Sequence, residues 1–184
     1  MLNPEITTAR LLLRRWRPDD LDPYAAICAD PEVMRFIRNG QLMSRAECAE
    51  AITGYEQAWE RQGFGRFAVE HAATGRFIGF VALSIPDWLP EVMPAVEIGW
   101  RLARDMWGQG LATEGARAVL KWGFEEAGLE RIISIVQVGN ASSERITAKL
   151  GMTFESETIE PRSGRRVRVY EAIRAAGHSS GPPQ

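Results

Sequence analysis

The chain has 184 residues, 45% of them hydrophobic and 25% charged, with a formal net charge of −2. This composition is typical of a water-soluble globular domain. The charge argues against a broad nucleic-acid-binding surface, and no apolar run approaches the roughly 18 residues of a membrane span. We therefore expect neither nucleic acid nor membrane as a partner. A single domain is expected over residues 1–175, followed by a disordered tail over 176–184.

A leucine-rich run, Arg10–Trp16, predicts the first strand, and Pro18 followed by two aspartates starts a helix that reaches about residue 29. A second helix is predicted over Ser44–Gln62. Ser44 and Glu47 have the spacing of a capping box at its start.

The next segments predict three strands, Gly65–His71, Arg76–Ser84 and Ala95–Leu102, the first two joined as a hairpin. In the third strand, apolar side chains alternate with Glu97 and Arg101, which places these two on the same face. Three prolines between 86 and 94 predict a loop before it.

In the second half, helices and strands alternate. A helix over 113–127 is followed by the strand Arg131–Val138. A helix from Asn140 to about Leu150 and two strands, about 153–159 and 165–174, complete the chain. This order indicates an α+β fold rather than regular βαβ repeats.

Cysteine and histidine usage bears on location and on metal binding. Cys28 and Cys48 fall in helix-like segments with no pairing pattern, and His71 and His178 lie far apart. Unpaired cysteines fit a reducing compartment, and the first residues lack the order of a signal peptide, so we expect a cytoplasmic protein. We expect no metal site, and core packing rather than nucleophilic roles for the cysteines.

The stretch Trp107–Glu114, WGQGLATE, places two glycines between a predicted strand and a predicted helix. Such a turn leaves backbone N–H groups unpaired at a helix N-terminus, where the helix dipole favours an anion. The sequence therefore predicts a phosphate site.

Two nucleotide motifs fit this turn poorly. A P-loop would end in Gly-Lys-Ser/Thr, which is missing. A dinucleotide fingerprint needs a third glycine where Thr113 stands, and an acidic residue at the end of the next strand. Glu130 has a suitable spacing but precedes that strand.

Trp107–Glu114 resembles the acyl-CoA pyrophosphate loop of the GNAT superfamily of N-acetyltransferases. It is most similar to the branch that contains the ribosomal-protein N-terminal acetyltransferases. The same resemblance extends, in order, to Thr8–Arg14 (TARLLLR), Glu97–Trp100 (EIGW), Asn140–Ser143 (NASS) and Lys149–Met152 (KLGM). It covers about residues 8–174. Trp107 and Met152 depart from the usual superfamily residues, and the tyrosine that often follows the asparagine motif is absent.

The resemblance implies a GNAT-like α+β fold. Its twisted mixed sheet, mostly antiparallel, would have about seven strands, with helices on both faces and a splay at the cofactor site. Acetyl-CoA is the implied cosubstrate, with its pyrophosphate held by the backbone amides of residues 108, 110, 112 and 113. The implied cofactor-binding residues are Ile98, Trp100, Leu102, Trp107, Gly108, Gln109, Gly110, Leu111, Ala112, Thr113, Asn140 and Ser143. Glu114 should point away from the phosphates.

Acetyl transfer to an amine needs a base, oxyanion donors and a stabilised thiolate. We nominate Glu97 as the catalytic base, with a salt bridge to an adjacent arginine as the alternative. Ser143 is nominated to donate a hydrogen bond to the leaving thiolate. Asn140 would contact the cofactor, cap a helix, or do both. Tyr170 is a lesser proton-donor candidate, because sheet packing explains it as well.

The resemblance implies an acetyl-CoA-dependent N-acetyltransferase that acts by direct amine attack in a ternary complex. The acceptor amine, a protein N-terminus or a small molecule, should bind between residues 35–43 and 161–166. Arg162, Arg165 and Arg166 there either attract an acidic acceptor or are simply solvated. The rivals are a non-catalytic acyl-CoA sensor and a nucleotide-binding oxidoreductase. The protein is expected to be a monomer or a homodimer.

Overall fold

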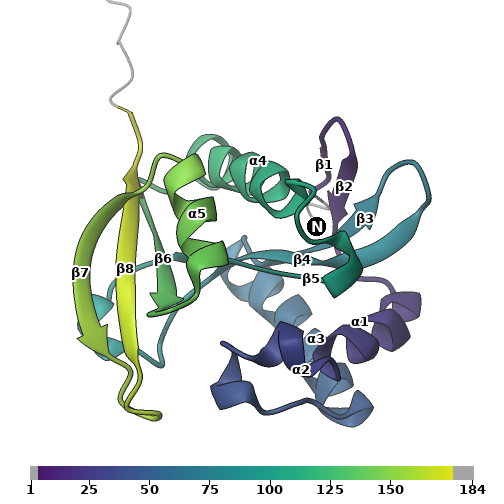
Figure 1. Cartoon of the computed structure of the whole chain (residues 1–184). Helices are drawn as coiled ribbons and strands as arrows, with labels where there is room; N and C mark the ends of the chain where they lie inside the picture. Colours follow the sequence, from purple (N-terminus) through teal and green to yellow (C-terminus); the bar gives the residue numbers. More distant parts are fainter. Residues whose placement is uncertain (1–3, 176–184) are drawn as a thin grey trace, which may run out of the picture.

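The computed structural model describes residues 4–175. An eight-stranded sheet runs through this part of the chain in the order β1-β2-β3-β4-β5-β6-β8-β7 (Figure 1). Only β5 and β6 are parallel neighbours. The predicted mixed, mostly antiparallel α+β sheet is therefore confirmed. The predicted tail over 176–184, which includes His178, lies outside the described residues.

The strands are short and follow the predicted segments closely. They are β1 (Ile6–Thr7), β2 (Leu11–Arg14), β3 (Arg66–His71), β4 (Arg76–Ser84), β5 (Glu97–Leu102), β6 (Arg131–Gln137), β7 (Thr153–Ile159) and β8 (Arg166–Ile173). The sheet has one strand more than the expected seven or so, because the two-residue β1 pairs with β2. A pair this short has too little alternation to be found in a sequence.

Helices cover both faces of the sheet, as predicted (Figure 1). They are α1 (Leu21–Cys28), α2 (Pro31–Met34), α3 (Arg45–Gln62), α4 (Leu111–Glu125) and α5 (Ala141–Lys149). In Figure 1, α4 and α5 lie on one side of β4 and β5, and α1, α2 and α3 lie on the other. The capping box of Ser44 and Glu47 is present at the start of α3. No helix among residues 4–175 is both long and apolar enough to cross a membrane.

Several element boundaries differ from the sequence prediction by one or two residues, as two examples show. The first long strand ends at Arg14 rather than Trp16, because the Trp16 side chain turns into the core beneath the sheet. The phosphate-loop helix begins at Leu111, two residues before the predicted start. Short α2 was not predicted, since four residues give no helical period.

Two hydrophobic clusters sandwich the sheet. One, under α4, contains Leu13, Val81, Ile98 and Val119 among others. The second, under α1 and α3, contains Trp16, Tyr24 and Phe80, together with Cys28 and Cys48. The expected core positions of both cysteines are thus confirmed.

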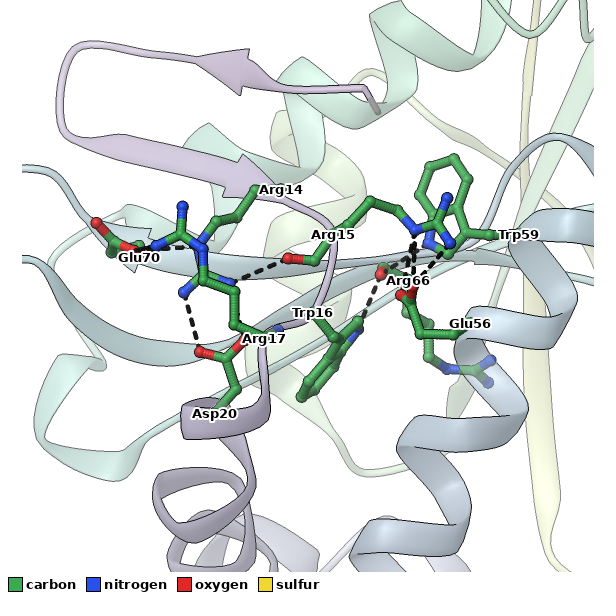
Figure 2. Close-up of polar contacts among 9 residues, drawn as sticks. All are labelled: Arg14, Arg15, Trp16, Arg17, Asp20, Glu56, Trp59, Arg66 and Glu70. Carbon is green, nitrogen blue, oxygen red and sulfur yellow. Dashed lines mark hydrogen bonds and ion pairs between the residues drawn. The ribbon is translucent and has the colours of Figure 1, made fainter. Parts of the chain in front are cut away.

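A polar network ties the end of β2 to the second cluster (Figure 2). The buried guanidinium of Arg14 pairs with Asp20 at 2.7 Å and with Glu70 at 3.0 Å. The indole N–H groups of Trp16 and Trp59 both donate to the backbone carbonyl of Arg66, at 2.9 and 3.1 Å. These bonds fix the start of β3.

The sheet opens between β5 and β6. Glu97 and Ile133 are their only registered pair, supported by the Ile133 N–H donating to the Val96 carbonyl at 2.8 Å. Beyond this pair β5 stays bonded to β4, and β6 to β8. In Figure 1, β6, β8 and β7 accordingly curve away from β4 and β5. The predicted splay is confirmed.

Candidate active site

A cavity of about 720 Å³ occupies the opening between β5 and β6. Its walls include residues 97–101 of β5, residues 134–137 of β6, and Asn140 and Ser143 at the start of α5. A volume in this range suits a small-molecule ligand. Residues 107–113 do not line this cavity. The glycine turn lies instead beyond the end of β5, the strand that forms part of the cavity wall.

Glu97 lies at the last β5–β6 pair, where the two strands begin to diverge. Burial raises its pKa to about 7, although the positive charge of Arg66 and the backbone amide of Ile135 act in the opposite direction. Within residues 4–175, Glu97 has no cationic group within the 4.0 Å of an ion pair. The salt-bridge alternative is therefore not realised. A carboxylate that titrates near neutral pH can take a proton from an amine.

The glycine turn has the conformation that an anion site requires. Gly108 and Gly110 have φ angles of +74° and +79°, and Gly110 is the N-cap of α4. Among the described residues, no acceptor is present for the backbone N–H groups of 108–113. Leu111 and Thr113 are buried and anchor the helix start, while residues 107–110 are exposed. The amides are thus held by their neighbours but free to bind a ligand.

Arg10, in the turn between β1 and β2, holds this loop from outside. Its guanidinium donates to the Gln109 carbonyl at 2.9 Å and pairs with Glu114 at 2.6 Å. Thr8 donates to the same carboxylate at 2.7 Å. Although partial burial acts in the opposite direction, these bonds lower the pKa of Glu114. The negative charge of Glu114 is therefore balanced by Arg10; that its carboxylate points away from a bound phosphate stays a prediction.

Asn140 caps α5, since its Oδ1 accepts the Ser143 N–H at 3.2 Å. The capping alternative is thus realised. Both residues are partly exposed and line the cavity. Contact with a cofactor remains a prediction for both.

The three β5 side chains nominated for cofactor binding face α4. Ile98 is fully buried, Leu102 is 4% exposed, and Trp100 packs against the same cluster. Their side chains serve the core, so Ile98 and Leu102 can present only backbone groups to a ligand. Trp107 donates its indole N–H to the Leu102 carbonyl at 3.0 Å, which ties the loop back to β5.

The two segments expected to flank an acceptor do meet at the cavity. Residues 36–39 and 41 line one side, and residues 160, 162, 163 and 165 line another. Arg166 does not line it and pairs instead with Glu157. Tyr170 is outside the lining and packs edge-on against Phe154, with ring centroids 6.0 Å apart. The sheet-packing explanation therefore holds for Tyr170.

Two cavity arginines, Arg66 and Arg101, were not nominated from the sequence. The alternation along β5 placed Arg101 on the same face as Glu97, which was the available signal. Arg66 comes from β3, and only the order of the strands in the sheet brings it near Glu97.

Burial raises the pKa of the Cys48 thiol to about 12, which makes that residue a poor nucleophile. No cluster of three or more metal-binding side chains occurs within residues 4–175.

Comparison with known proteins connects these features to a family. Residues 10–153 match the model of the acetyltransferase (GNAT) domain. The Bacillus subtilis (strain 168) protein YkkB is 29% identical over 168 residues, which cover 91% of this chain and 94% of YkkB.

Solved structures share the fold. An acetyltransferase from Agrobacterium tumefaciens superposes with a TM-score of 0.80 at 23% identity, covering 95% of this chain and 96% of its own. RimL, a ribosomal L7/L12 α-N-protein acetyltransferase solved with coenzyme A, gives 0.76 at 16% identity, covering 92% and 98%.

Proposed function

Since the chain belongs to the GNAT family of acetyltransferases, we propose that it transfers the acetyl group of acetyl-CoA to a primary amine. In this proposal the amine attacks the thioester directly while both substrates are bound. The observation that carries the proposal is the position of Glu97, which has a pKa of about 7 and stands at the point where β5 and β6 separate.

The cofactor would lie along the opening, with its pyrophosphate on the unpaired amides of 108–113. The positive φ angles of Gly108 and Gly110 would direct these amides toward the ligand, and the helix dipole of α4 would add partial positive charge there. Because β5 leads toward this loop, the pantetheine arm would run back along the edge of Ile98–Leu102 that has no strand partner. The thioester would then approach Glu97.

Glu97 would take the proton that the acceptor ammonium must lose before the neutral amine attacks. The oxyanion would be stabilised by backbone N–H groups of the unpaired β5 edge. Ser143, at the start of α5 and on the cavity wall, would donate a hydrogen bond to the leaving thiolate. A serine hydroxyl is too weak an acid to do more.

The alternative proposal is a sensor that binds acyl-CoA without transferring the acyl group. Two experiments separate the alternatives. Acetyl-CoA should raise the melting temperature, and an amine panel of peptide N-termini, polyamines, aminoglycosides and amino acids should reveal CoA release. Glu97→Gln should lower kcat/KM by about 10²–10⁴ while acetyl-CoA still binds.

Binding without release across the panel would favour the sensor. A thermal response to NAD(P) but not to CoA would contradict both proposals and favour the oxidoreductase.

A further inference from the structure

We propose that the acceptor amine carries an anionic group, a carboxylate or a phosphate, and that Arg101 and Arg66 bind this group. The inference rests on the proposed transferase function and extends it to the class of acceptor. It depends on the charges of the cavity, on the partners of these two arginines and on the side chains around them.

The cavity is strongly basic although the chain carries a net charge of −2. Five arginines line it, Arg38, Arg66, Arg101, Arg162 and Arg165, against two glutamates, Glu97 and Glu160. Of these arginines, only Arg38 has a carboxylate within 4.0 Å among residues 4–175, namely Glu47 at 3.3 Å. Elsewhere the chain pairs its arginines readily, as Arg14, Arg15 and Arg131 illustrate. The positive charge of the cavity is therefore left for a ligand to neutralise.

The guanidinium of Arg101 lies deep and has no anionic partner among the residues that the structure describes. Nη1 donates to the Tyr24 hydroxyl at 3.2 Å and contacts the Cys28 sulfur at 3.0 Å. Nε is buried without a hydrogen-bond partner. Nη2 bonds to no described residue and is not among the buried unpartnered atoms, so it is accessible from the cavity. Arginine stays protonated, and an incompletely paired charge at such depth is costly.

Arg66 has a similar environment. Its guanidinium stacks over the Tyr55 ring at 4.2 Å, while the two indole bonds to its carbonyl fix its backbone. In Figure 2 no dashed line reaches this guanidinium. The Tyr55 hydroxyl lies 2.9 Å from the Tyr24 hydroxyl, and Arg101 donates to the latter. The two tyrosines therefore connect Arg66 with Arg101.

Aromatic contacts hold these cations in place without neutralising them. Arg101 lies 5.2 Å from the Phe80 centroid and 5.9 Å from that of Tyr24. Cation–π contacts orient a guanidinium and leave its charge available for a ligand. A planar guanidinium group held in this way suits a carboxylate or a phosphate, either of which can accept two parallel hydrogen bonds from it.

The same face of β5 explains how one acceptor could reach both ends of the cavity. Glu97, Gly99 and Arg101 share this face, and no atom lies within 4 Å of where a Gly99 side chain would begin. The Cα atoms of Glu97 and Arg101 are about 13 Å apart at the usual rise of a strand. An amine at Glu97 and an anion at Arg101 would therefore be separated by several bonds.

The test compares amines that differ only in the anionic group. The pairs are 4-aminobutyrate with 4-aminobutanamide, β-alanine with β-alaninamide, and O-phosphoethanolamine with ethanolamine, each assayed by CoA release. The wild type should prefer the anionic member by about tenfold or more in kcat/KM, as expected for a charge-assisted hydrogen bond. Arg101→Met should abolish the preference, because it should lower kcat/KM for the anionic member far more than for the neutral member. Arg66→Met should reduce the preference.

A second measurement does not require turnover. With CoA saturating the phosphate loop, glutarate and inorganic phosphate are titrated calorimetrically into the wild type and Arg101→Met. Binding to the wild type alone supports the inference, and the stronger ligand identifies the anion. Arg174→Met, which removes an exposed arginine outside the cavity, is the matched control and should behave as wild type.

Equal use of both members of every pair, or anion binding that survives in Arg101→Met, would overturn the inference while the transferase function stands. If no amine is acetylated, the titration decides the inference. If CoA itself fails to bind, the proposed function fails first. Arg101→Lys keeps the positive charge but not the planar guanidinium group. It replaces Arg101→Met in both experiments if the methionine variant does not fold.

Discussion

Glu97 is the residue whose surroundings most clearly differ from those of an ordinary surface carboxylate. Its neighbours Ile98 and Ile133 are buried, and the cation that acts on it, Arg66, stacks on Tyr55 rather than pairing with Glu97. Arg66 therefore only moderates the effect of burial on the pKa of Glu97. The result is a carboxylate that is half-ionised near neutral pH, which suits a group that must accept and release a proton in each cycle.

The first prediction concerns pH and activity. Because the base must be ionised, kcat/KM should rise with pH through about 7 and level off above it. Glu97→Gln should lack this rise and retain only a small residual rate. The measurement is a pH–rate profile at acceptor concentrations well below KM, with acetyl-CoA saturating. A wild-type profile that is flat between pH 6 and about 8 would contradict the assignment of Glu97 as base.

The second prediction concerns pH and stability. The pKa of Glu97 is higher in the folded than in the unfolded chain, so its favourable contribution is complete below about pH 4.5 and is lost as pH rises through about 7. Glu97→Gln should therefore unfold with more free energy than wild type at pH 8, by on the order of 2 kcal/mol. At pH 4.5 the two should be nearly equal. Denaturant unfolding at both pH values provides the check, with exposed Glu126→Gln as a control.

At the scale of elements, the glycine loop with α4 and the asparagine turn with α5 are built alike. Each follows one of the two parallel strands at the opening, and each starts a helix. They differ in how the helix is capped. Gly110 caps α4 with no side chain, whereas Asn140 uses its own amide oxygen.

The third prediction tests the glycine conformation. Gly110→Val should cost on the order of 1–2 kcal/mol, since L-residues rarely adopt the left-handed region, and should abolish stabilisation by acetyl-CoA because the amides turn away. Gly63→Val is the matched control. Its φ of +75° imposes the same strain, no atom lies within 4 Å of the new Cβ, and it lies at the end of α3. Calorimetric affinity for acetyl-CoA should fall only in the first variant.

The fourth prediction separates the two roles of Asn140. Asn140→Ala should destabilise the protein by about 1 kcal/mol through loss of the cap, and Asn140→Ser should restore most of that stability. If Asn140 also contacts the cofactor, Asn140→Ser should still bind acetyl-CoA more weakly than wild type. Full affinity in the serine variant would leave Asn140 a capping residue only.

The elements illustrate what a single sequence can and cannot predict. The capping box of Ser44 and the alternation of β5 are local patterns, and both are realised. The two-residue β1 and the four-residue α2 are too short to carry a period. Arg66 entered the site because β4 lies between β3 and β5, and such sheet order depends on contacts far apart in sequence. The loop motif predicted the conformation of its glycines, but not that Arg10 would bind its carbonyl.

At the scale of the whole molecule, the opening divides the sheet into two parts. Strands β1 to β5 form one part, and β6, β8 and β7 form the other, joined in the sheet by a single β5–β6 pair. The hydrophobic cluster beneath α4 bridges the two parts, since it contains both Ile98 of β5 and Ile132 of β6. A ligand in the opening would therefore contact both parts at once.

The fifth prediction follows from this division. Acetyl-CoA at one hundred times its Kd should stabilise the fold by about 2.7 kcal/mol. Hydrogen exchange should slow most at the unpaired edges of β5 and β6 and in the first turns of α4 and α5. Stabilisation confined to β1–β4 would mean that the ligand does not occupy the opening.

The contact of Arg10 with Gln109 and Glu114 joins positions about a hundred residues apart in the chain. During synthesis the loop emerges long after the strand that will hold it, so its final shape forms late. The same contact makes Arg10 a support of the proposed cofactor loop, although Arg10 does not line the cavity. A truncation through Arg10, or a bulky tag that displaces β1, would therefore release the loop from a distance, and a tag at the other end of the chain avoids this.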